Sequence, residues 1–141
     1  MSMSNFTNFA DGVSIRGVPV LQLHPGKVFW VGNSTTPQPD GAVGNDSRKG
    51  SFQQPLGTIN QAINLCVSGR GDIIAVQPGH AETISTAAGI AMSKSGVALI
   101  GVGNGALQPT LSFSATASTM TVAGNNCTIK NIKLLLFIHD V

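Results

Sequence analysis

The fold of this chain is decided by the stretch from Gly71 to Ile132, which reads GDIIAVQPGHAETISTAAGIAMSKSGVALIGVGNGALQPTLSFSATASTMTVAGNNCTIKNI. Short β-prone runs recur there between glycine, proline and asparagine corners, and none has the length or the 3.6-residue spacing of a helix. Val97 and Leu99 alternate with their neighbours, which is typical of a strand with one buried face. The expected strands are DIIAVQPGH (72–80), ETIS (82–85), GIAM (89–92), VALIGVGN (97–104), TLSFS (110–114), TMTVAGNN (119–126) and CTIKNIKL (127–134).

The interval between the strongest runs indicates how the strands pair. Three of them, IIAVQPG (73–79), ALIGVGN (98–104) and TIKNIKL (128–134), recur at about 25 to 30 residues, which fits one coil of a solenoid. Short strands in such a coil pair in parallel with the coils above and below. We therefore expect an all-β fold, a stacked parallel β-helix. An antiparallel sandwich or jelly roll, which also shows many short strands, is the alternative.

Asparagines at the strand ends favour the first of these folds. Asn104, Asn125 and Asn126 follow strand runs, where asparagine tolerates a left-handed backbone. Each can also hydrogen-bond to the same residue type in the next coil. We expect these corners to stack.

Composition and charge exclude several classes of partner. Only 10% of the 141 residues are charged, and the net charge is +2. The basic residues are scattered, with Arg48-Lys49 as their one adjacent pair, so we expect no nucleic-acid partner. The N-terminus lacks a basic region followed by an apolar one, and no 18 apolar residues run together, so we expect no membrane span and assembly in a cytoplasm. Cys66 and Cys127 stand among aliphatic residues and are expected to be buried thiols.

The chain divides into an arm and a domain. Residues 1–27 are expected to form an extended docking arm, because Pro19 and Pro25 interrupt any regular ladder. Residues 28–141 are expected to form the β-helix domain. Within it we expect a long surface loop at 33–55, a helix at 56–67 and the coils at 71–141. The apolar arm residues expected to dock on a neighbouring subunit or a larger assembly are Phe6, Phe9, Val18, Val20, Leu21 and Leu23.

The expected helix at 56–67 is amphipathic. Thr58 and Gln61 form a T-x-x-Q capping box, and Ser68-Gly69 ends the helix. An amphipathic helix just before the first strong strand would cover the apolar core and the open strand edges of the first coil. We therefore interpret it as a cap. Its apolar face is formed by Ile59, Ala62, Ile63, Cys66 and Val67.

The opposite end of the stack is expected to be open. The segment from Leu134 to Ile138 is apolar on both faces, so it must be covered on both sides by a further coil or by other chains. We expect Leu134, Leu136 and Ile138 to lie in an interface there. The chain is accordingly interpreted as a fragment of a longer solenoid, or as a subunit whose open end its neighbours close.

The acidic residues do not form a catalytic pair. From Gly71 onward they are Asp72, Glu82 and Asp140, and no two are i, i+2 partners on one strand, whereas a glycoside hydrolase needs two carboxylates about 5 to 9.5 Å apart. His80 and Glu82 could be read as a dyad, but a histidine at a Pro-Gly turn usually bonds locally. We expect no enzyme and no cofactor.

Two further motifs are expected to be structural. Arg70-Gly71-Asp72 spells a cell-adhesion tripeptide, but an aspartate bonding to the backbone at the entry to a strand explains it. Asp40, Asn45 and Asp46 in the long loop carry calcium-type ligands without the spacing of an EF-hand. We expect no metal site.

Four segments carry a resemblance to a known class of proteins. GVPVLQLHPGKVFWVGN (17–33), GSFQQPLGTINQAI (50–63), GDIIAVQPGHAETIS (71–85) and NNCTIKNIK (125–133) resemble tailed-bacteriophage and prophage virion proteins with a right-handed parallel β-helix of the pectate-lyase-like class. The resemblance spans residues 12–136. It implies an N-terminal arm before a helix-capped, right-handed β-helix of several coils, commonly assembled as a homotrimer.

Three function classes follow from the residues and the resemblance. The first is a structural virion component, assembled in the host cytoplasm, that is a capsid decoration, head-fibre or tail-associated protein and binds other virion proteins through its arm. The second is a spike that binds a host glycan or receptor. Aromatic residues are only 5% of the chain and Trp30 is its one tryptophan, which disfavours a glycan groove. The third is a polysaccharide depolymerase whose catalytic coils lie outside this sequence.

Overall fold

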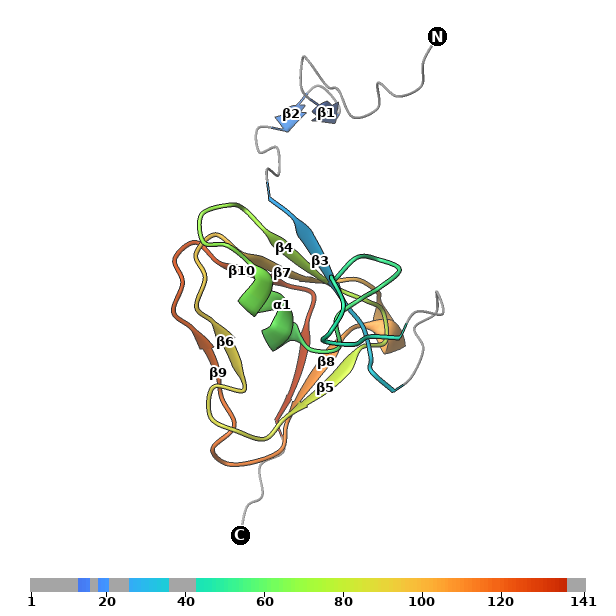
Figure 1. The fold of residues 1–141 in the computed structure, drawn as a ribbon, viewed down its shortest axis with the longest axis vertical. Coiled ribbons are helices and arrows are strands. Elements are labelled where there is room, and N and C mark those ends of the chain that lie inside the picture. Colours follow the sequence, from blue (N-terminus) through green and yellow to red (C-terminus); the bar gives the residue numbers. More distant parts are fainter. Residues whose placement is uncertain (1–12, 16–17, 21–25, 36–42, 137–141) are drawn as a thin grey trace.

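The structure, a computed structural model, describes residues 13–15, 18–20, 26–35 and 43–136. These residues form mostly short strands, with one α-helix and one 3₁₀ turn among them (Figure 1). The helix is α1 (Ile59–Leu65) and the 3₁₀ turn is η2 (Gly105–Leu107). The strands are β1 (Val13–Ile15), β2 (Val18–Val20), β3 (Val28–Val31), β4 (Ile73–Val76), β5 (Ala81–Ile84), β6 (Ile90–Met92), β7 (Ala98–Gly101), β8 (Thr110–Phe113), β9 (Met120–Val122), β10 (Thr128–Lys130) and β11 (Lys133–Leu136).

Strands β3 to β11 form three sheets in which every pair is parallel. Sheet 1 has the order β10-β7-β4-β3, sheet 2 the order β11-β8-β5, and sheet 3 pairs β6 with β9. Figure 1 shows the three sheets as the sides of a triangle around an interior. The predicted parallel pairing is confirmed, and the antiparallel sandwich is excluded for the described residues.

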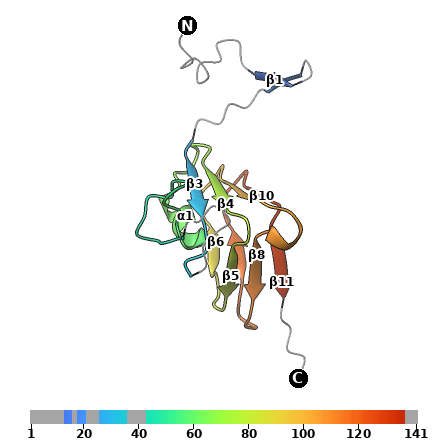
Figure 2. The ribbon, with the colours of Figure 1, turned by 90° about the vertical axis from the view of Figure 1, so that its right-hand side faces the viewer.

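The chain visits the three sheets in turn. β4, β5 and β6 form one circuit through sheets 1, 2 and 3, β7, β8 and β9 form the next, and β10 and β11 begin a third. Ile73 pairs with Ala98, and Ala98 pairs with Thr128, so the circuits repeat at the predicted interval of about 25 to 30 residues. Figure 2 shows β5, β8 and β11 side by side, with α1 towards one end of the stack and β11 at the other.

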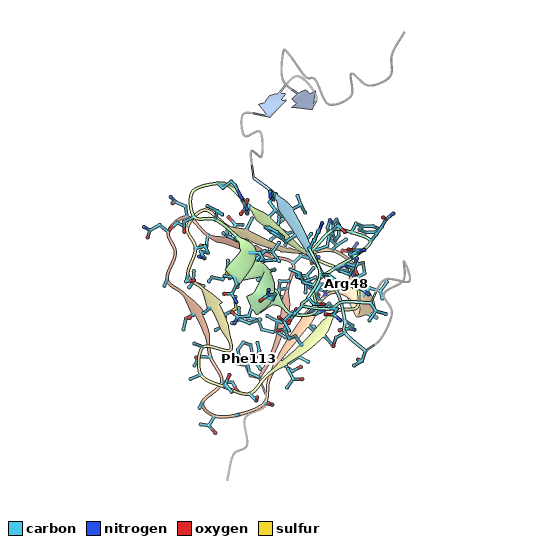
Figure 3. All side chains as sticks on the ribbon, in the orientation of Figure 1. Arg48 and Phe113 are labelled. Carbon is cyan, nitrogen blue, oxygen red and sulfur yellow. The ribbon has the colours of Figure 1, made fainter. Side chains whose placement is uncertain are left out.

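The core consists of rows of apolar side chains that run from circuit to circuit. Partners in a parallel pair point to the same face, so each inward position stacks on the equivalent one in the next circuit. Ile74 stacks on Leu99 in sheet 1, and Ile84 stacks on Phe113 in sheet 2. All four are buried. Figure 3 shows Phe113 projecting from β8 into the interior, whereas Arg48 lies in the loop outside the sheets.

The corners between strands use asparagine in a different way from the one predicted. Asn126 has a positive φ of 56°, as expected, but Asn104 is extended at φ −130°. The left-handed corner that joins two sheets is Asn131, with φ 59°. Its Nδ2 donates to the carbonyl oxygens of Gly101 and Gly103 rather than to another asparagine. The side chain therefore ties its own corner to the backbone of the preceding circuit.

The expectation of a single strand over 127–134 is wrong, because the chain turns at Asn131. Asn131 breaks this segment into β10 and β11, which belong to sheets 1 and 2. The corner also requires a glycine beneath it, because a Cβ on Gly101 would lie only 2.2 Å from the carbonyl oxygen of Asn131. The sharp change of direction depends on both residues.

Helix α1 is shorter than the predicted 56–67. Leu56 instead forms a parallel bridge with Val31 beside β3, and Val67 lies beyond the helix and is exposed. Thr58 is the N-cap, and its Oγ1 accepts from the backbone N–H of Gln61. The other half of the expected capping box is absent, because the N–H of Thr58 donates to Asp46 Oδ1. Asp46 thus accepts the hydrogen bond from the N–H of Thr58 that the side chain of Gln61 would accept in a capping box.

The helix covers the first circuit at one end of the stack. It packs against β3, β4 and β6 and buries Ile59, Ala62 and Ile63. Its contact with β6 includes a hydrogen bond from the backbone N–H of Ala91 to Asn60 Oδ1. The side chain of a helical residue thus bonds to the backbone of a strand that has no neighbouring strand on this side.

The arm and the loop are described in part. β1 and β2 pair antiparallel with Pro19 opposite Ser14, so the expectation of an arm without a ladder is wrong for these six residues. Loop residues 43–55 are held to the body by backbone hydrogen bonds such as Gly44 N–H to the carbonyl of Asn33. The predicted docking residues Phe6, Phe9, Leu21 and Leu23, and the side chains of Val18 and Val20, lie outside the described parts, as does Asp40 of the loop.

Candidate interaction surface at the open end

The stack has one open end, formed by β9, β10 and β11. Among the described residues each of these strands is the last in its sheet, so each has a neighbouring strand on one side only. The hydrogen bonds that the described residues of β10 and β11 make run to the preceding circuit, as in Thr128 N–H to the carbonyl of Val97 and Lys133 N–H to that of Pro109. The described residues therefore leave the opposite edges of these strands without a strand partner.

The core rows continue to this end and are exposed there. Val122 is 51%, Ile129 44%, Leu134 54% and Leu136 68% exposed. Each stacks on a buried residue of the preceding circuit, for Ile129 pairs with Leu99, Leu134 with Leu111 and Leu136 with Phe113. The same positions that form the core inside the stack form an apolar surface at its end. We call Val122, Ile129, Leu134 and Leu136 the open-end surface.

Two of the predicted interface residues belong to this surface. Leu134 and Leu136 lie on β11 and point to the core side, while Ile138 lies outside the described residues. The prediction missed Val122 and Ile129. Ile129 lies between polar Thr128 and Lys130, but only the register with Leu99 and the sheet order show that it continues a core row and that no further strand covers it in the described part of the chain.

The other end of the stack is closed by the chain itself. The outer edge of β3 bonds to the loop, because Trp30 N–H donates to the carbonyl of Gly50 and Leu56 N–H donates to the carbonyl of Trp30. Helix α1 covers the first strands of sheets 2 and 3. The two ends therefore differ. At one end the loop and α1 cover the strand edges and the core, and at the other end the apolar core rows are exposed.

The open end carries positive charge at its outward positions. Lys130 stands in the row of Ile100 on sheet 1, and Lys133 stands in the row of Thr110 on sheet 2. Both lysines are exposed, and they flank the corner at Asn131. Within the described parts of β9, β10 and β11 there is no acidic residue. Lysines on an edge strand discourage pairing with a like edge.

Asp72 of the Arg-Gly-Asp tripeptide is a buried structural centre, as predicted. Arg70 contacts it through two hydrogen bonds of 2.7 Å, and the backbone N–H groups of Lys27 and Val67 each donate to it at 2.8 Å. Burial by itself raises the pKa of Asp72, but the hydrogen bonds from Arg70, Val67 and Lys27 outweigh it and lower the pKa from 3.8 to about 2. The carboxylate joins the start of β3, the exit of α1 and the entry to β4.

Glu82 and His80 form a second structural centre. His80 Nε2 lies 3.1 Å from Glu82 Oε2, and the same oxygen accepts from the backbone N–H of Ile59 at 3.1 Å. Because the carboxylate can only accept, Nε2 carries the imidazole proton. His80 is buried, and its Nδ1 has no hydrogen-bond partner among the described residues. The pair holds the first turn of α1 on β5.

Asp46, one of the calcium-type ligands of the long loop, is also held in hydrogen bonds within the chain. Asp46 accepts from the N–H groups of Gly57 and Thr58 through Oδ1 and from Thr58 Oγ1 through Oδ2. In the described part of the chain no three His, Cys, Asp or Glu residues gather as metal ligands would.

The two cysteines differ in burial. Cys66 is a buried free thiol whose pKa is raised by burial to about 11, whereas Cys127 is only half-buried, contrary to the prediction.

The described residues contain no helix with the length and apolar character that a bilayer span requires. Comparisons of the chain with protein families, with curated proteins and with solved structures give no match.

Proposed function

We propose that the body of this chain is a three-sided, right-handed parallel β-helix and that the chain is a structural component of a bacteriophage virion. Two successive circuits and the two strands that begin a third, with in-register core rows, support the fold. The resemblance of segments 17–33, 50–63, 71–85 and 125–133 to phage virion proteins supports the setting. In this proposal the chain is a capsid decoration, head-fibre or tail-associated subunit, located in the virion.

The observation that carries the proposal is the difference between the two ends of the stack. Isolated apolar side chains on a surface are ordinary, but here the exposed residues continue the core rows over all three sheets. Val122 extends the row of Met92 in sheet 3, as Leu134 extends that of Leu111 in sheet 2. Such an end suits a subunit that is covered by its neighbours in an assembly.

The acidic centres suit a stiff building block. Asp46, Asp72 and Glu82 each accept hydrogen bonds from backbone N–H groups of segments at least 11 residues away in the sequence. Glu82 joins β5 to α1, and Asp72 joins β4 to the residue before β3. Charge-assisted bonds of this kind fix the elements relative to one another. In the proposal the N-terminal arm docks on other virion proteins, and the copies associate as a homotrimer.

Incorporation into particles tests this function. Phage particles carrying the wild-type chain, Leu134→Asn or Leu135→Asn are purified, and the chain is quantified by immunoblotting and located by immunogold electron microscopy. Leu135 is the matched control, because it lies next to Leu134 on β11 but points outward with Ser112. We expect the wild type and Leu135→Asn on particles and Leu134→Asn reduced at least severalfold. Complete absence of the wild-type chain from particles would reject the proposal.

A second candidate function has one observation in its favour. Trp30 and Phe52 form an edge-to-face aromatic pair, with ring centroids 4.9 Å apart, beside the outer face of sheet 1. Phe52 is exposed, and aromatic surfaces stack on sugar rings in glycan-binding proteins. A glycan-binding spike would retain cell-surface polysaccharide in a pull-down, and Phe52→Ala would abolish the retention. Equal retention by the variant would exclude this patch as a glycan site.

A further inference from the structure

The open edges specify the shape of whatever covers them. Leu134 and Leu136 are two residues apart on β11 and both face the core side, with outward Leu135 between them. A strand added beside β11 therefore needs apolar side chains at alternate positions to complete these rows. Ile129 on β10 sets the same requirement in sheet 1. An extended segment with alternating apolar residues fits both edges.

The two lysines add a requirement for charge. On the same edge strands, Lys130 and Lys133 occupy outward positions, one on each side of the Asn131 corner. An added strand places its own outward side chains directly beside them. Opposite charges in such cross-strand positions stabilise the pair, and like charges destabilise it. Acidic residues at the outward positions of the incoming strand are therefore favoured.

A second copy of this chain fits this edge poorly. The β3 end of another copy cannot supply the strand, because residues of the loop and α1 already occupy it. Two open ends pairing with each other would bring Lys130 and Lys133 of one copy to the lysines of the other. No acidic residue on the described strands of the open end compensates for that repulsion.

We propose that the open end binds an extended β-strand of a different polypeptide, in which apolar residues alternate with Asp or Glu. The apolar side chains cover Leu134, Leu136 and Ile129, and the acidic side chains lie beside Lys130 and Lys133. Main-chain hydrogen bonds to the free edge supply the affinity common to all such strands, and the side chains select the partner. This inference rests on the proposed function, since it names the chemistry of the neighbour that covers the open end.

Two synthetic peptides test the selection by charge. One alternates Val with Glu and the other alternates Val with Lys, each labelled with a fluorophore, and binding to the full chain is measured by fluorescence anisotropy at low salt. We expect the Glu peptide to bind at least about tenfold more tightly, because two exposed charge pairs change from attractive to repulsive. The double variant Lys130→Glu/Lys133→Glu should invert this preference, and Lys49→Glu, an exposed loop lysine at the other end, should not.

Hydrogen exchange, the oligomeric state and incorporation into particles give further outcomes that support or overturn the acidic partner. Amide hydrogen exchange with the Glu peptide bound should slow at residues 128–136, and slowing confined to other strands would overturn it. Equal binding of the two peptides, or binding of neither, would also overturn it. A dimer in analytical ultracentrifugation that Leu134→Asn dissolves would identify a second copy as the occupant. If Leu134→Asn is excluded from particles but the lysine double variant is incorporated normally, the acidic partner is rejected while the virion function stands.

Discussion

Glu82 Oε2 lies 3.1 Å from the backbone nitrogen of Ile59, so a carboxylate on β5 holds the first turn of α1 across 23 residues of sequence. Glu82 stands in the inward row of Leu111, at the one circuit where a helix rather than a strand lies beyond it. A carboxylate on the core side is tolerated there because the N–H of Ile59 and Nε2 of His80 both contact it. The acid is therefore part of the junction between cap and sheet.

Two variants of Glu82 distinguish the contribution of its hydrogen bonds to stability from the contribution of its charge. Glu82→Ala leaves the N–H of Ile59 and Nε2 of His80 without this acceptor, and we expect a loss of about 1 to 3 kcal/mol in the free energy of unfolding. Glu82→Gln retains an acceptor oxygen and should lose less than half as much. Urea denaturation followed by circular dichroism measures both. Thr83→Ala, an exposed neighbour on β5, is the control, and an Ala variant as stable as this control would show that the junction contributes nothing.

Asp72 predicts how stability depends on pH. Its pKa is lowered from 3.8 to about 2, so the folded state binds the proton less tightly than the unfolded state does. The stabilisation is complete above about pH 4 and is lost as the pH falls towards 2. Because Arg70 is 31% exposed and water screens part of the pair, we expect a contribution on the order of 1 to 2 kcal/mol.

The measurement for Asp72 is a comparison of two pH profiles. The wild type should lose stability between pH 4 and pH 2 in urea titrations, whereas Asp72→Asn should start lower and show a shallower loss over that range. Parallel profiles for the two proteins would show that another group causes the acid dependence. Arg70→Gln should lie between them, since the backbone donors of Lys27 and Val67 are retained.

The cap itself is tested by placing a charge on its buried face. Ile63 lies on the buried face of α1 and is 1% exposed. Ile63→Asp buries a carboxylate without a partner, which lowers the free energy of unfolding by about 3 to 5 kcal/mol. We expect the variant to be insoluble or to unfold at much lower urea. Asn64→Asp adds the same charge at the next, exposed position and should be close to wild type. An unchanged unfolding curve for Ile63→Asp would reject the role of the helix as a cap.

Local patterns were sufficient for the elements that depend on neighbouring residues. The alternation around Leu99 gives β7 its buried face, and the 25-residue step from Ile73 to Ala98 gives the parallel pairing. The T-x-x-Q pattern predicts Thr58 at the helix start, and in the structure Thr58 is the N-cap, with its Oγ1 accepting from the N–H of Gln61. These signals are contained within one element or in the repeat between two.

Long-range contacts account for what the patterns missed. The N–H of Thr58 donates to Asp46 and not to Gln61, and Leu56 forms a bridge with Val31 and does not begin the helix. Both differences arise because residues 43–56 fold back over Trp30. No local rule connects these segments. Ile129 is an apolar residue in an expected strand, but its exposure depends on what lies beside β10, which only the sheet order shows.

Asn131 gives the sharpest test of the corner between β10 and β11. Its φ of 59° costs an alanine about 1 kcal/mol or more, and its side chain also donates to Gly101 and Gly103. We expect Asn131→Ala to lose about 1 to 3 kcal/mol in urea denaturation, and Asn131→Gly to lose only the part due to the hydrogen bonds. Asn104→Ala, at an extended corner with no side-chain cap bond, should be nearly neutral. If Gly were as destabilising as Ala, the left-handed backbone would not be the cause, and the two carbonyl contacts would account for the whole effect.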